Sequence, residues 1–311
     1  MDPTPPVVLE PDATLEPAGF IVDSDGVRIH FLDWGGPPSP GGPGVIAIHG
    51  LGHTAWAWSP VARRLAGPAG LRRFVAMDLR GHGLSDAPTE DGAYELAVQG
   101  GDVLAVAEGS GLIVSSDDRV VAVGHGFGAI AAAYAASEMG ERCAGLLLID
   151  GGWESLETAT GLDVEEFLRG MEEPPEVLAS MTAFLADRRD FDPATWDRDQ
   201  EAAARATVVE THAGRVVPSA RPHATEAIVR AMFDYEPSGV LPAVIAPITA
   251  MLAVDDETRS RARALAAASA DREGAGRSAI RVLDHGTVGH NLMRYRPREV
   301  VAAILGAGEG A

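Results

Sequence analysis

Cysteine is almost absent from this chain, since Cys143 is the only one among 311 residues. A single cysteine cannot form an intramolecular disulfide, and it cannot supply the several thiolates of a structural zinc site. A chain without a disulfide framework is typical of a reducing compartment. We therefore expect a cytoplasmic protein without disulfides and without a cysteine-based metal site.

Positive charge is also scarce. The 25 basic residues stand against 45 acidic ones, which gives a formal net charge of −20 at pH 7. Such a surface repels phosphate backbones and anionic lipids, so we expect neither nucleic acid nor membrane as a partner. Net charge describes the surface rather than a pocket, and the expected partner is a small-molecule substrate bound by a monomer or a homodimer.

Long apolar runs are missing as well. No run approaches the length of a membrane-spanning helix, and the first residues lack the basic and apolar regions of a secretory signal. Residues 1–17 are instead rich in proline and acidic side chains, and we expect a loosely ordered lead. The whole chain is 46% hydrophobic and 23% charged, which is ordinary for a globular protein with a substantial core.

Short apolar stretches are present and alternate with helical patterns. Residues 19–23 and 27–34 predict a hairpin of two alternating strands. The next predicted strands are 45–48, 74–77, 120–123, 146–149, 248–254 and 279–283, and the predicted helices are 58–66, 94–108, 129–136, 257–268 and 297–305. Continuous apolar strands separated by helices predict an α/β fold, a mostly parallel twisted sheet with helices on both faces. Ligands of such sheets bind at the carboxyl ends of the strands.

The alternation stops between residues 153 and 242. Helical patterns occur at 163–169, 175–188, 193–206 and 225–232, with no buried strand between them. We therefore predict an inserted helical cap over 153–242, on a core formed by 18–152 and 243–308. Several apolar residues of the insertion could line a pocket or could only attach the cap to the core: Phe167, Met171, Met181, Phe184, Met232 and Phe233.

The chain is organised around VVAVGHGFGAIAAA, residues 120–133. It reads as a strand, a tight Gly-rich turn and a helix, which is the context of a nucleophile elbow. The central residue of such an elbow carries a hydroxyl, thiol or carboxylate, but here it is Gly126. Glycine adopts the strained backbone of an elbow easily, so the geometry can survive although no side chain can attack a substrate. An ordinary Gly-rich turn is the alternative interpretation.

Several stretches in a fixed order now identify a resemblance. They are HGLGHTAWAW at 49–58, FVAMDLRGHGLSD at 74–86, VGHGFGA at 123–129, LLLIDGG at 146–152, PITAMLAVDD at 247–256 and VGHNL at 288–292. Over roughly residues 18–308 the chain resembles a capped α/β-hydrolase of the esterase or lactonase type. In this family a nucleophile, an acid and a histidine follow one another along the chain.

The resemblance implies three site positions. Gly126 stands at the nucleophile position, His290 at the catalytic histidine, and Asp256 at the acid that orients the histidine. Asp255 is an alternative acid, and Asp150 is another, because some members carry the acid after the strand that follows the elbow.

Further roles follow from the same resemblance. The backbone N–H groups of Phe127 and Leu51 would stabilise an oxyanion. Trp56, His53 and Trp153 are candidates for the substrate-binding wall.

Other polar residues of the matching stretches are expected to be structural. Asp78 and Arg80 would brace the loop beside the site, and His49, His82 and His125 would be hydrogen-bonded parts of the scaffold. His49 and His53 have H-x-x-x-H spacing, but glycines place them in a loop rather than on one helix face. No H-E-x-x-H motif or nearby acidic ligand accompanies them. We therefore expect neither a metal nor another cofactor.

Three functions remain open. The first is hydrolysis of a small ester, lactone or related carbonyl compound by water that a His290–Asp256 dyad activates, with Gly126 either natural or an engineered replacement of serine. The second is a non-hydrolytic acid–base reaction, such as a lyase, cyclase or isomerase reaction. The third is non-catalytic binding of a small molecule, although an intact dyad argues against it.

Overall fold

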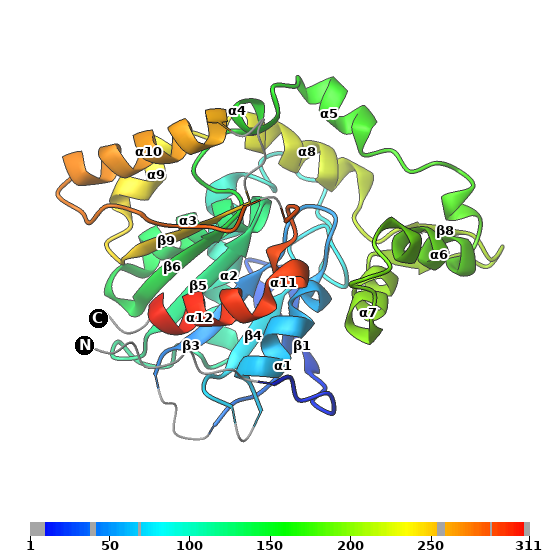
Figure 1. The fold of residues 1–311 in the computed structure, drawn as a ribbon, viewed down its shortest axis with the longest axis horizontal. Helices are drawn as coiled ribbons and strands as arrows, with labels where there is room; N and C mark the ends of the chain where they lie inside the picture. The colour runs from blue at the N-terminus through cyan, green and yellow to red at the C-terminus, as the bar shows by residue number, and fades with distance from the viewer. Residues whose placement is uncertain (1–9, 38–41, 68–69, 254–258, 287, 308–311) are drawn as a thin grey trace.

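The computed structural model describes residues 10–37, 42–67, 70–253, 259–286 and 288–307. Figure 1 shows a central twisted sheet between layers of helices. The main strands are β1 (Ala18–Ser24), β2 (Val27–Asp33), β3 (Gly44–Ile48), β4 (Phe74–Met77), β5 (Val120–His125), β6 (Cys143–Ile149), β9 (Ile248–Leu252) and β10 (Arg281–Asp284). The helices of the core are α1 (Ser59–Leu65), α2 (Leu96–Gly109), α3 (Phe127–Met139), α10 (Arg259–Gly274), α11 (Leu292–Tyr295) and α12 (Pro297–Ala307).

The described residues form an eight-stranded sheet in the order β1-β2-β4-β3-β5-β6-β9-β10. β1 and β2 form the predicted hairpin, and β2 pairs antiparallel with β4. The strands from β4 to β10 pair in parallel. β5 and β6 are adjacent strands. Both are fully buried, because helices cover both faces of this part of the sheet. The predicted α/β architecture with a mostly parallel sheet is confirmed.

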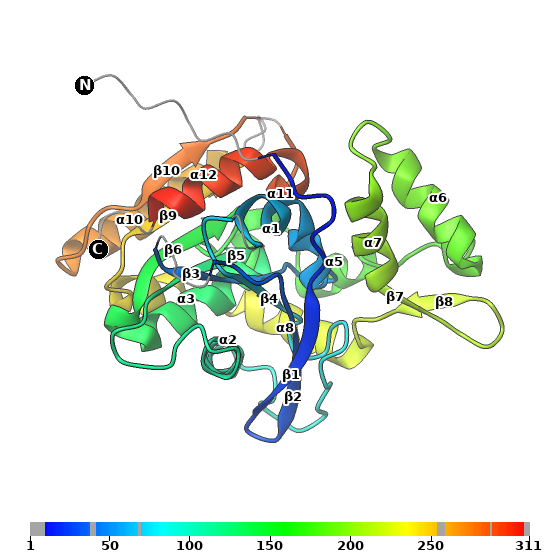
Figure 2. The same ribbon diagram turned by 90° about the horizontal axis from the view of Figure 1, so that it is seen from below.

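Two apolar layers hold the helices to the sheet. On one face, residues of α2, α3 and α10 share a hydrophobic cluster with one set of strand side chains. On the other face, α1, α11 and α12 pack on the opposite set. Figure 2 shows the red α12 and blue α1 on one side of the sheet and α2 and α3 on the other.

The insertion between β6 and β9 differs from the prediction. It contains α4 (Leu156–Thr160), α5 (Val164–Gly170), α6 (Met181–Phe191), α7 (Arg198–Ala206), α8 (Pro222–Phe233) and α9 (Pro237–Val240). Two 3₁₀ helices, η3 (Val177–Ala179) and η4 (Leu241–Ala243), accompany them, together with a hairpin of β7 (Val208–Glu210) and β8 (Val216–Pro218). The sequence predicted no buried strand here, and β7 and β8 are short strands in which only the first residue of each, Val208 and Val216, is buried. Strands of three residues are too short to produce a recognisable alternation.

One predicted helix of the insertion is divided. The pattern at 175–188 becomes η3 followed by α6, because Ser180 adopts extended backbone and its hydroxyl caps α6 by accepting a hydrogen bond from the N–H of Ala183. Figures 1 and 2 both show α6, α7 and the β7–β8 hairpin as a lobe to the side of the sheet. We call this part, residues 177–218, the outer lobe.

Residues 10–17 of the predicted loose lead are attached to the core. The guanidinium of Arg63, on α1, donates hydrogen bonds to the carbonyl of Leu15 and to the carboxylate of Glu16. Its Nε binds Asp199 of α7 at 2.9 Å, so the same side chain also joins the outer lobe to the core. Among the helices of the described residues, none is both long and apolar enough to cross a membrane.

Two neighbouring glycines of α2 predict opposite effects of the same substitution. A Cβ on Gly100 would lie 2.7 Å from the Cβ of Tyr134 on α3, whereas a Cβ on Gly101 would meet nothing within 4 Å. We expect Gly100→Ala to force α2 and α3 apart and to lower the free energy of unfolding by about 2 kcal/mol. Gly101→Ala should raise it by up to about 1 kcal/mol, because alanine favours a helix. Urea unfolding of both variants measures this, and equal effects would contradict the close packing of α2 on α3.

Candidate functional site

The turn between β5 and α3 has the geometry predicted for an elbow. Gly126 lies there with φ +53° and ψ −118°, a conformation that side-chain-bearing residues rarely adopt. Its N–H donates a hydrogen bond to the carbonyl of Ile149, 3.0 Å away at the end of β6. The predicted positive φ of Gly126 is confirmed.

The turn that follows β6 packs directly against this elbow. A Cβ on Gly151 would lie 2.9 Å from the Cα of Gly126, so only glycine permits the approach. Asp150, immediately before it, has a positive φ of 47° although it is not glycine. The close contact of the two turns therefore brings the carboxylate of Asp150 to the edge of the elbow.

His290 faces both turns. Its Nδ1 lies 2.5 Å from Oδ2 of Asp150, and its Nε2 lies 3.3 Å from the position that a Cβ on Gly126 would occupy. An Nδ1–H that donates to a carboxylate leaves Nε2 free to accept a proton. A carboxylate beside His290 was predicted, and it is that of the alternative residue, Asp150. The preferred acid, Asp256, and the neighbouring Asp255 lie outside the described residues.

The carboxylate of Asp150 is buried and surrounded by donors. Its Oδ1 accepts hydrogen bonds from Nη1 of Arg261 at 3.0 Å and from the N–H of Ala253 at 3.2 Å. Burial alone would raise the pKa of Asp150, but the hydrogen bond and charge of His290 and the charge of Arg261 outweigh it and lower that pKa below its ordinary value. Asp150 is therefore held as an anion that can stabilise a protonated His290.

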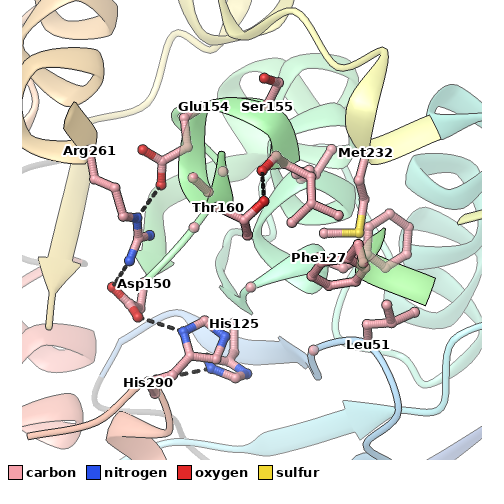
Figure 3. Close-up of a pocket in the computed structure, with 18 of the residues that line it drawn as sticks. Leu51, His125, Phe127, Asp150, Glu154, Ser155, Thr160, Met232, Arg261 and His290 are labelled. Atoms are coloured by element: carbon pink, nitrogen blue, oxygen red, sulfur yellow. Dashed lines mark hydrogen bonds and ion pairs between the residues drawn. The ribbon is translucent and has the colours of Figure 1, made fainter. Parts of the chain in front are cut away.

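Arg261 extends this chain of contacts to a second carboxylate. Its Nε donates to Oε1 of Glu154 at 2.6 Å, and its guanidinium lies over the ring of Trp153, 5.4 Å from the centroid. Figure 3 shows Arg261 between Glu154 and Asp150, with His290 next in line. Burial raises the pKa of Glu154, and the charge of Arg261 opposes this only in part. Sequence reasoning missed both Arg261 and Glu154, because neither belongs to a recognisable motif.

A cavity of about 390 Å³ opens in front of these residues. Apart from glycines, its wall consists of Leu51, His53, His125, Phe127, Ile130, Asp150, Glu154, Ser155, Leu156, Ala159, Thr160, Phe167, Met171, Met232, Arg261 and His290. In Figure 3 the charged residues gather at one end, and Leu51, Phe127 and Met232 lie at the other. The cavity therefore joins a reactive polar end to an apolar body, as small-molecule sites generally do.

The candidate wall residues predicted from the sequence separate in the structure. His53 lines the cavity, but Trp56 and Trp153 do not. Trp153 is fully buried beneath Arg261, and Trp56 packs edge-on against Trp34 at 6.2 Å. The two tryptophans therefore support neighbouring residues rather than the cavity surface.

Leu51 and Phe127 lie on two fixed backbones beside the cavity. Phe127 is the first residue of α3, where backbone N–H groups lack intrahelical acceptors. Leu51 lies in the loop after β3, which two histidines fix. His49 donates from Nδ1 to the carbonyl of Gly50 and accepts from the N–H of Leu79 at Nε2. His82 accepts from the N–H of Gly52 at 3.2 Å.

The remaining scaffold predictions agree with these contacts. Nε2 of His125 lies 3.1 Å from the carbonyl oxygen of His290, and the two rings pack with centroids 4.4 Å apart. Asp78 accepts hydrogen bonds from the N–H groups of Ala55 and Leu84, so it ties two loops together. Arg80 forms a bidentate pair with Asp102, with both distances 2.6 Å. Because His49 uses both ring nitrogens internally, it does not form a ligand pair with His53.

The buried His49 and the partly buried His53 predict a dependence of stability on pH. Burial lowers the pKa of His49 to about 3 and that of His53 to about 4, below the value of about 6.5 in an unfolded chain. The unfolded state therefore binds more protons as the pH falls below 6.5, and the stabilisation present above that pH is lost on the way to pH 4. Between pH 7.5 and pH 5 we expect a loss of about 2 kcal/mol in the free energy of unfolding from each of these residues.

The measurement is urea unfolding across this pH range. His53→Gln should flatten the dependence by about 2 kcal/mol, because one titrating site is removed. The control is His212→Gln, at an exposed position of the outer lobe. An unchanged slope in His53→Gln would contradict the lowered pKa of His53.

Comparisons with known proteins agree with this architecture. Residues 45–304 match the alpha/beta hydrolase family. E-2-(acetamidomethylene)succinate hydrolase superposes with a TM-score of 0.73 at 19% identity, covering 94% of this chain and 98% of that one. A thioesterase domain from the curacin biosynthetic pathway superposes with a TM-score of 0.68 at 23% identity, covering 93% and 99%. At these identities the likeness concerns the fold.

Sequence relatives match over a shorter region. Epoxide hydrolase B of Mycobacterium tuberculosis is 35% identical over 127 residues, which are 41% of this chain and 33% of the relative. Bifunctional epoxide hydrolase 2 of Sus scrofa is 32% identical over 126 residues, 40% of this chain and 20% of the relative. The chain thus matches no more than a third of the length of these relatives. The family match itself extends over most of the chain, which therefore belongs to the alpha/beta hydrolase family.

Proposed function

We propose that the chain is a hydrolase in which a water molecule replaces the missing nucleophilic side chain. The single observation that carries this proposal is the position of His290, with Nδ1 on Asp150 and Nε2 3.3 Å from where a Cβ on Gly126 would stand. A water molecule in that space is within reach of Nε2, so His290 can act as its general base. Asp150 holds the imidazole and stabilises the imidazolium that forms.

The attack on a carbonyl compound then needs two further groups. As the water oxygen bonds to the carbonyl carbon, negative charge develops on the carbonyl oxygen. The N–H groups of Leu51 and Phe127 are the proposed donors to this oxygen, because both residues border the cavity beside Gly126. His290 finally returns its proton to the leaving oxygen. Without a covalent step we expect a rate enhancement on the order of 10³–10⁴ over water.

The proposed substrate is a small ester, a lactone or a related compound. The names of the mycobacterial and pig relatives add epoxides to this range. The insertion would act as a cap, since Leu156, Phe167, Met171 and Met232 supply apolar wall to the cavity. These side chains would contact the part of the substrate that does not react.

A non-hydrolytic acid–base reaction is the second candidate. The intact pair of His290 and Asp150 favours it, because proton transfer to and from a bound substrate needs the pair and no nucleophile. Restoring a side chain at position 126 separates the two candidates.

Gly126→Ser should place a hydroxyl beside Nε2 of His290. If the reaction is hydrolytic, we expect the variant to hydrolyse p-nitrophenyl esters at least about 100-fold faster than the parent chain, because covalent catalysis becomes available. A serine-directed phosphonate should label the variant and leave the parent unlabelled, as mass spectrometry of the intact protein would report. Slower turnover of the parent's own substrate in Gly126→Ser, together with no gain on esters, would instead support the acid–base reaction.

The acid can be identified in the same background. We expect Asp150→Asn to reduce the restored esterase activity by about 10³-fold or more, because asparagine no longer fixes the tautomer or stabilises the imidazolium. Asp256→Asn is the matched variant at the residue that the sequence favoured. A large loss in Asp256→Asn with little loss in Asp150→Asn would overturn the role of Asp150.

A further inference from the structure

The charged end of the cavity is an internal network of ion pairs. Asp150 and Glu154 bind the same guanidinium, that of Arg261, at 3.0 Å and 2.6 Å. All three residues are at least nine-tenths buried, and all three belong to the cavity wall. Two carboxylates thus neutralise one cation inside the wall.

Arg261 is the sole lysine or arginine among the described wall residues. The sequence contains no lysine at all, so an arginine would be needed to bind an anionic group by a strong ion pair. Arg188 affects the pKa of His53 through its charge, but it is itself paired with Glu173 and Asp187 and is not part of the wall. Among lysine and arginine side chains, no surplus positive charge therefore faces the cavity from the described residues, because Asp150 alone balances Arg261 even when Glu154 is protonated.

The other histidines of the wall do not supply a cation. Burial and the neighbouring charge of His290 lower the pKa of His53 to about 4 and lower that of His125 far below its ordinary value. Both rings are consequently neutral at pH 7. The rest of the wall is apolar apart from the hydroxyls of Ser155 and Thr160, and Thr160 donates its own to the carbonyl of Leu156.

We propose that this cavity selects uncharged substrates and excludes carboxylate-bearing ones, and that Glu154 is a specificity-determining residue. The inference deepens the proposed hydrolytic function and rests on it. By binding Nε of Arg261, Glu154 balances the cation that a substrate carboxylate would otherwise use. The chain would then differ from its structural neighbour named as a hydrolase of a succinate, although the two share a fold.

The substrate class is accordingly an uncharged ester, lactone or epoxide with an apolar body. Its electrophilic carbon would lie at the His290 end, and its body would lie against Phe127, Phe167 and Met232. An added carboxylate on such a molecule would lose its hydration without gaining a partner of opposite charge.

The test compares two ketones of the same shape in the unmodified protein. They are 6-oxo-6-phenylhexanamide and 6-oxo-6-phenylhexanoate, which differ in terminal charge and cannot be hydrolysed at the ketone. We expect the amide to bind at least about tenfold more tightly at pH 7 and low ionic strength, measured by isothermal titration calorimetry. Equal binding, or tighter binding of the carboxylate, would overturn the proposal.

Two variants then assign the selectivity to one residue. Glu154→Gln keeps an oxygen that can accept from Arg261 but removes one negative charge from the wall, so the preference for the amide should shrink about threefold or more. Glu157→Gln makes the same change on the exposed side of α4, a few residues away, and should leave the preference unchanged. Equal shrinkage in both variants would assign the effect to surface charge and refute the role of Glu154. Circular dichroism and thermal unfolding confirm that each variant is folded.

These measurements separate the two proposals. Charge selectivity is read from binding, and the proposed function is read from turnover of esters. Hydrolysis of uncharged esters without a preference between the two ketones would refute this inference alone. A clear preference for the amide without any hydrolysis would refute the hydrolytic function and leave the selectivity standing.

Discussion

The hydrogen bond between Nδ1 of His290 and Oδ2 of Asp150 is the contact on which the site depends. It joins residues 140 positions apart in the chain, one in the loop after β10 and the other at the end of β6. The bond can form because the turn at Gly151 packs on the turn at Gly126, within a distance that permits no Cβ. Arg261 then holds the other oxygen of Asp150, so the carboxylate has a fixed orientation. Close packing of the two turns, together with the hold of Arg261 on Asp150, therefore sets the direction of Nε2.

Because position 126 is glycine, the proposed reaction needs a water molecule in place of a side-chain nucleophile. In a catalytic triad the serine hydroxyl is attached covalently to the elbow, so the entropy of positioning it is lost once, when the chain folds. In the proposed hydrolysis, a water molecule would be ordered again in each reaction cycle and would leave no covalent intermediate. The protein thus retains His290, Asp150 and the proposed oxyanion donors, on loops that follow strands or on the first turn of a helix. What it lacks is only the group that these parts would activate.

Much of the fold could be predicted because its strands are short, apolar and bounded by glycine or charged residues. The stretch FVAM was predicted at 74–77 and forms β4 with these bounds. His290 and the elbow were also found, since both lie in motifs of fixed spacing. The carboxylate partner of His290 was harder to predict from the sequence, because Asp150 and Asp256 both follow apolar strands. A choice between them requires the distances between the loops. Arg261 and Glu154 could not be found from sequence, because their roles arise from the approach of α10 to the end of β6. Trp153 resembled a pocket residue in sequence, yet its ring lies beneath Arg261, which only a structure reveals.

The outer lobe has a small hydrophobic cluster of its own, in which Phe184, Val208 and Val216 are buried apart from the two clusters of the core. The insertion contributes to the apolar wall of the cavity through α4, α5 and α8, and no residue of the outer lobe is part of that wall. Segments with separate cores open and close as separate cooperative units. Selection on mutations in the outer lobe would thus depend mainly on how they change the stability of the lobe. The lobe could therefore diverge in sequence or length over evolution without altering the residues that line the cavity.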